Sequence, residues 1–146
     1  MRMSTSPESA HPSPQRRRVG GAAVAFGLCA APLGWSAQLV VTTSAAAHAC
    51  FAQDVPLLLP LWPSLHRIVL AVDLVALVLC LLAGVVAWRV WHKTRDERPG
   101  SGHHVLESGD GRTRFMAMAG MMTSGLFFVA VALSTLNATA LAACGR

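Results

Sequence analysis

Three polar side chains, Gln38, Asp73 and Asn137, interrupt the long apolar stretches of this sequence. A polar group in an apolar medium is costly unless it is paired, so the placement of these residues is informative. The first interpretation is a polar cluster in which the three side chains form hydrogen bonds between neighbouring helices. Two alternatives remain open: a proton or cation site at Asp73, and pairing of Asp73 with a partner subunit.

Two of the four cysteines occupy positions that suit a cross-link. Cys50 and Cys144 each come just after a long apolar stretch, whereas Cys29 and Cys80 lie inside one. If the first and third stretches cross a membrane in the same direction, Cys50 and Cys144 reach the same side. In an oxidising compartment such a pair forms a disulfide, and two free thiols are the alternative.

The sequence has no recognisable catalytic motif. It contains no glycine-rich phosphate loop, no Ser/His/Asp signature and no paired carboxylates within an apolar stretch. His103 and His104 lie in a glycine-rich segment where we expect them to be solvated. The methionines at positions 116, 118, 121 and 122 would point around a helix rather than toward one site. We therefore expect no catalytic residues, no cofactor and no metal site, and we expect that the protein is not an enzyme.

The elements that carry these residues are predicted from the distribution of charge. Charged residues make up 13% of the chain, against about 25% in soluble domains. None occurs between Val19 and Gln53 or between Phe115 and Gly145, and Ile68–Trp88 is interrupted only by Asp73. A helix needs about 20 apolar residues to cross the hydrocarbon core of a bilayer. The pattern therefore predicts an all-α membrane protein, a small bundle of three transmembrane helices.

The boundaries follow from the same pattern and from the breaker residues. The N-terminal segment holds four Ser, three Pro and almost nothing apolar, which predicts disorder, and three prolines exclude a regular helix from the loop after the first span. The predicted organisation is a disordered cytoplasmic tail at 1–18, transmembrane helices at 19–43, 65–90 and 115–143, an outer loop at 44–64, a cytoplasmic loop at 91–114 and an outer C-terminus at 144–146.

Basic residues predict the orientation of the bundle. Of twelve Lys and Arg residues, ten lie before the first span, at the end of the second (Arg89) or between the second and third, and only Arg67 and Arg146 lie on the other side. Because basic flanks stay in the cytoplasm, we expect the N-terminus inside and the C-terminus outside. The positive net charge is thereby explained by the orientation in the membrane, and nucleic-acid binding is not needed to account for it. With one Lys, one Ile and no Tyr, the composition is typical of a GC-rich bacterium, which favours a multi-pass protein of the bacterial inner membrane.

The three polar residues are predicted to share one depth and to face the interior. Counted from expected outer ends at Ala45, Leu65 and Ala143, they lie seven, eight and six residues deep, or about 9 to 12 Å. On each predicted helix the polar residue lies on a face with small residues, which let membrane helices approach closely. We call such a face an interior stripe. The predicted interior stripes are Gly27, Ala31, Gly34, Gln38 and Thr42; His66, Asp73, Ala76, Cys80, Gly84 and Ala87; and Gly120, Thr123, Ala130, Ser134, Asn137 and Cys144.

Parts of the chain resemble small three-helix membrane proteins that are associated with bacterial terminal (haem-copper) oxidase gene clusters. The resembling segments are 34–38 (Gly-Trp-Ser-Ala-Gln), 48–50 (His-Ala-Cys), 87–91 (Ala-Trp-Arg-Val-Trp) and 114–144. In such relatives we would expect a His near the position of Gln38, so no haem ligand is carried over. The resemblance implies an accessory protein of the respiratory chain that packs against a larger complex. The competing expectation is a proton or cation transport component that uses Asp73 in a self-associated oligomer.

Overall fold

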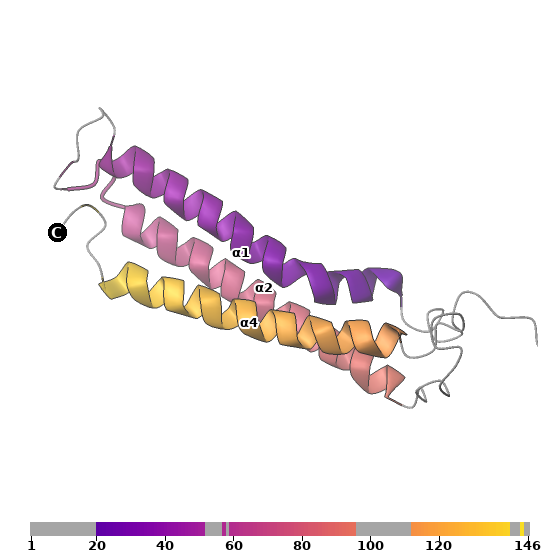
Figure 1. Ribbon diagram of the computed structural model, residues 1–146. Helices are drawn as coiled ribbons and strands as arrows, with labels where there is room; N and C mark the ends of the chain where they lie inside the picture. The colour runs from indigo at the N-terminus through magenta and orange to yellow at the C-terminus, as the bar shows by residue number, and fades with distance from the viewer. Residues whose placement is uncertain (1–19, 52–56, 58, 96–111, 141–143, 145–146) are drawn as a thin grey trace, which may run out of the picture.

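The computed structural model describes residues 20–51, 57, 59–95, 112–140 and 144. These residues form three long helices, α1 (Gly21–Cys50), α2 (Leu65–Thr94) and α4 (Arg112–Ala140). Figure 1 shows α1 and α4 beginning at the same end of the bundle, with α2 running in the opposite direction. Each helix is long enough and apolar enough to cross a membrane. The predicted all-α fold with three membrane-spanning helices is confirmed.

The helices extend beyond the predicted loop boundaries. Helix α1 continues to Cys50, six residues beyond the predicted start of the outer loop at residue 44. Helix α2 ends at Thr94 and α4 begins at Arg112, which also shortens the predicted cytoplasmic loop at both ends. Hydropathy marks only the part of a helix that matches the hydrocarbon core, about 20 residues. A helix can continue past that boundary, since its backbone groups remain hydrogen-bonded there. The predicted disordered tail lies outside the described residues.

Small side chains fill the centre of the bundle. The main buried cluster consists of alanines, Cys80 and Val131, and larger side chains such as Trp35 and Phe127 pack around it. The rings of Trp35 on α1 and Phe127 on α4 lie 5.2 Å apart between centroids. Large aliphatic side chains instead point outward on all three helices. This arrangement suits a membrane bundle, in which close backbone packing rather than burial of bulky side chains holds the helices together.

The three helices approach most closely where glycines meet an alanine. A Cβ atom added at Gly120 on α4 would lie 2.8 Å from the backbone oxygen of Gly27 on α1. One added at Gly27 would lie 3.2 Å from the Cβ atom of Ala87 on α2. No larger residue fits at Gly120 without a backbone shift. These two glycines therefore set the distance between the helices.

A cross-link closes one end of the bundle, which we call the disulfide end. The sulfur atoms of Cys50, the last residue of α1, and Cys144, just past α4, lie 1.98 Å apart in a disulfide bond, with Cα atoms 5.4 Å apart. The loop after α1 folds back at the same end, where the amides of Leu57 and Leu61 donate to the carbonyls of Cys50 and Ala49. Cys29 and Cys80 carry free thiols.

The buried faces agree with the predicted stripes on two helices and differ on the third. Gly27, Ala31 and Gln38 are buried on α1, and Asp73, Ala76, Cys80 and Ala87 on α2, whereas His66 is exposed. On α4, Gly120 is buried, but the series Ala117, Ser124 and Val131 faces the interior in place of the predicted Thr123, Ala130 and Asn137. The face is displaced by one residue, which is about 100° around a helix.

The displacement on α4 has a local chemical reason. The hydroxyl groups of Thr123, Ser134 and Thr135 each donate to the carbonyl four residues earlier, at Ala119, Ala130 and Val131. A hydroxyl that is satisfied within its own helix gains little from facing the bundle interior. The rule that small polar residues point inward therefore fails for these positions.

Candidate polar membrane site

The centre of the candidate site is a buried hydrogen bond between two helices. The Gln38 side-chain amide on α1 donates from Nε2 to Oδ1 of Asp73 on α2 across 2.8 Å. Asp73 is 1% exposed and Gln38 is 3% exposed. The sequence predicted that these side chains share one depth, and the structure brings them together. Both side chains are almost fully buried, so bulk water competes little with this bond.

Each partner of this bond also has a second, unsatisfied atom. Oε1 of Gln38 and Oδ2 of Asp73 are both buried, and neither has a hydrogen-bond partner in the described part of the chain. Both atoms act as acceptors when Asp73 is ionised. A buried acceptor without a donor costs about 1–3 kcal/mol, and more when it is charged. The site therefore lacks at least one donor.

A groove of about 480 Å³ lies beside the Gln38–Asp73 pair; most of its surface is apolar, and we call it the polar groove after the polar side chains among its lining residues. All three helices contribute to it, and most of its polar lining comes from amide, hydroxyl and carboxyl groups. His66 is the one lining residue besides Asp73 with a titratable side chain. The groove is lined by Gln38, Leu39, Thr42, Thr43, Ala46, Leu65, His66, Val69, Asp73, Ser134, Asn137 and Ala138.

Asn137 was predicted to belong to the buried polar cluster, but it is not part of it. It lies at the predicted depth, since it lines the same groove as Gln38 and Asp73. Its side chain, however, is exposed rather than buried. The displaced face of α4 explains the error, because the buried series Ala117, Ser124 and Val131 lies one residue away from the face that Asn137 was expected to share. Asn137 therefore carries its amide group on the surface of the bundle rather than in its interior, at membrane depth.

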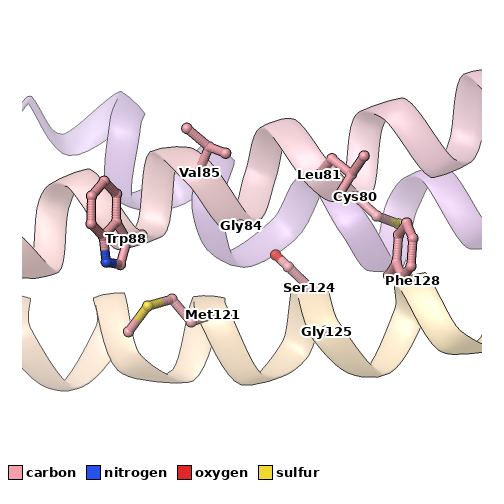
Figure 2. A pocket seen from close by; sticks show the side chains of 9 residues that line it. All are labelled: Cys80, Leu81, Gly84, Val85, Trp88, Met121, Ser124, Gly125 and Phe128. Atoms are coloured by element: carbon pink, nitrogen blue, oxygen red, sulfur yellow. The ribbon is translucent and has the colours of Figure 1, made fainter.

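A second groove of about 380 Å³ runs between α2 and α4. Figure 2 shows the Ser124 side chain on α4 pointing across toward Gly84 on α2, with Trp88 and Met121 beside it. The Ser124 hydroxyl is buried and has no hydrogen-bond partner among the described residues, unlike the other helical hydroxyls described above. Sequence reasoning missed Ser124. The seven-residue series Ala117–Ser124–Val131 was the signal that could have revealed it. Apart from this hydroxyl the groove is apolar.

The histidines and thiols that the structure describes do not assemble into a further centre. His48 and His66 are exposed, and His92 is exposed with its ring 5.7 Å from that of Trp88. Among the described residues, no three His, Cys, Asp or Glu side chains lie close enough to hold a metal ion. The predicted solvated pair at 103 and 104 lies outside those residues. The chemistry of the described site is thus that of one carboxyl group and its amide and hydroxyl neighbours.

These groups can donate and accept hydrogen bonds and can hold a proton, but they include no activated nucleophile. Comparison of the chain with models of protein families, with curated proteins and with solved structures finds no significant match. The function must therefore be inferred from the arrangement of the side chains themselves.

Proposed function

We propose that this chain is a non-enzymatic accessory protein that packs against a larger membrane complex, and that the polar groove receives a transmembrane helix of the partner. The exposed side chain of Asn137 is the observation that carries the proposal. A primary amide that faces lipid loses its hydrogen bonds to water and gains none. A neighbouring helix with a side-chain donor or acceptor would satisfy it.

The surroundings of Asn137 fit a helix better than a small polar molecule. The groove collects side chains from three helices; its amide groups can pair with Ser, Thr, Asn or Gln on a partner, and its hydroxyl oxygens, which donate within their own helices, can still accept from one. Ala46 and Ala138 provide small surfaces along the same groove, and small residues allow helix backbones to approach closely. Interhelical hydrogen bonds contribute about 0.6–2 kcal/mol each, so several are needed for a stable contact.

The finer parts of the proposal rest on the sequence. The basic asymmetry supports a position in the bacterial inner membrane with the C-terminus outside, and an oxidising outer compartment suits the Cys50–Cys144 bond. The resemblance to small proteins associated with terminal oxidases makes a respiratory oxidase the favoured partner.

Photocrosslinking in the native membrane tests the groove. We expect a photoreactive residue at Ala138, which lines the groove, to capture a membrane subunit of one discrete complex. The matched control is position 136, where Leu136 is 63% exposed and outside the groove. Adducts at both positions, or lipid adducts alone at 138, would contradict the proposal. Purification of the tagged protein in mild detergent then identifies the complex, and oxidase subunits are the expected companions.

A second candidate function has its own observation. Asp73 places a carboxyl oxygen that has no partner within the described helices next to the groove, which suits a proton or cation transport component that uses Asp73 in an oligomer. Three helices rarely enclose a pore, so this function requires self-association. The same crosslink would then join position 138 to a second copy of the chain, and a homo-oligomer alone would purify.

A further inference from the structure

We infer that Asp73 is a proton-binding site that is occupied in the folded protein: the neutral carboxylic acid donates from Oδ2 to Oε1 of Gln38. The carboxyl and amide groups then form a closed pair with two hydrogen bonds. This inference concerns the resting protein and does not depend on whether the polar groove has a partner.

The unsatisfied atoms of the site carry the inference. One hydrogen bond, from Gln38 Nε2 to Asp73 Oδ1, is already present at 2.8 Å. The two buried atoms left over, Gln38 Oε1 and Asp73 Oδ2, are the second oxygens of the same two planar groups. An ionised Asp73 leaves both as acceptors, and two acceptors cannot pair. One proton on Oδ2 turns that oxygen into a donor, and Oε1 of Gln38, on the side chain already bonded to the same carboxyl group, is the buried acceptor proposed for it.

The charges around Asp73 favour the same state. An ionised carboxylate that is 1% exposed requires a cationic partner or several donors to offset its lost hydration. From α1 the groove is lined by Gln38, Thr42 and Thr43, and from α4 by Ser134 and Asn137, none of which carries a charge. The remaining titratable group is His66, which is exposed and stands seven residues from Asp73 on α2, or about 10 Å along the helix.

The hydroxyl groups near the pair are committed elsewhere. Thr42 donates to the carbonyl of Gln38, Thr43 to that of Leu39, and Ser134 to that of Ala130. None of these three supplies the donor that Oδ2 lacks. A proton on Asp73 completes the hydrogen bonding of the pair without a further side chain.

Infrared spectroscopy of the full-length protein in lipid vesicles tests the inference. A protonated carboxyl group has a carbonyl stretch well separated from the bands of a carboxylate, and carboxyl-¹³C aspartate shifts it to lower frequency. We expect an isotope-shifted acid band at neutral pH in the wild type. The same band should persist in the triple variant Asp54→Asn/Asp96→Asn/Asp110→Asn, which retains Asp73 as its one aspartate, and should be lost in Asp73→Asn.

Two results would overturn the inference. Absence of the acid band at neutral pH from both the wild type and the triple variant means that Asp73 is ionised and that water, a cation or a partner supplies the missing donor. In Gln38→Leu we expect the acid band to move to higher frequency, because the proton on Oδ2 loses its acceptor. An unchanged band would show that Gln38 is not that acceptor. If Asp73→Asn fails to fold, the triple variant decides the question without it.

Discussion

Gly120 on α4 lies against the backbone carbonyl of Gly27 on α1, so closely that a Cβ atom at position 120 would be 2.8 Å from that oxygen. The contact is between backbones, and no side-chain rotation can relieve a clash there. The crossing of α1 and α4 therefore depends on the absence of a side chain at one residue. That dependence is the basis of the first prediction.

We expect Gly120→Ala to destabilise the bundle by about 1–3 kcal/mol, the usual cost of overpacking. The matched control is Gly125→Ala on the same helix, because a Cβ atom at Gly125 meets nothing within 4 Å. Alanine favours a helix over glycine by about 0.5–1 kcal/mol, so the control should be neutral or slightly stabilising. Unfolding in mixed detergent measures both variants. Equal stability of the two would contradict the close crossing.

The second prediction separates the shape of Asp73 from its charge. Asp73→Asn keeps a planar group that can both accept from and donate to Gln38, so we expect its stability to stay within about 1 kcal/mol of the wild type. Asp73→Leu leaves the buried amide of Gln38 without a partner and should cost about 1–3 kcal/mol.

Leu74→Ala serves as the control for the Asp73 variants, because Leu74 is exposed on the same helix and its replacement should change stability less than Asp73→Leu does. Thermal unfolding in one detergent compares all of them. Unchanged stability and complex assembly in Asp73→Leu would refute the role of the Gln38–Asp73 pair. Loss of function with an intact fold in Asp73→Asn would favour the transport function over hydrogen bonding alone.

The third prediction concerns the disulfide. Cys50 and Cys144 are 94 residues apart in the sequence, and closing a loop of that length should stabilise the fold by about 4–5 kcal/mol in the chain-entropy model. Peptide mapping without reductant should recover Cys50 joined to Cys144 and should find Cys29 and Cys80 open to alkylation after denaturation. Alkylation of both Cys50 and Cys144 before any reduction would rule the bond out.

The fourth prediction is the orientation in the membrane. The ten-to-two distribution of basic residues places the segment between α2 and α4 in the cytoplasm and the C-terminus outside. Alkaline phosphatase, which is active only in an oxidising compartment, should therefore be active when fused after Arg146 and inactive when fused after Gly102. The opposite pattern of activities would reverse the assignment.

The sequence by itself determined the class of fold and the depth of the polar residues. Long stretches without charge require helices in a membrane, since lipid leaves backbone groups no other partners. Counting residues along a helix then fixes depth at about 1.5 Å per residue, which is why Gln38 and Asp73 could be expected at one level. The stripes of α1 and α2 were also predictable, because a glutamine and an aspartate in lipid have a strong reason to face inward.

Only the tertiary structure decided which way α4 faces. The sequence favoured Thr123, Ala130 and Asn137 for the interior, whereas Ser124 and Val131 are buried there. Rotating a helix by one residue costs little when its hydroxyl groups are satisfied by its own carbonyls, as that of Thr123 is. The choice then depends on the fit of side chains around the Gly27–Gly120 contact, and such fit arises from three helices together rather than from the pattern of any one of them.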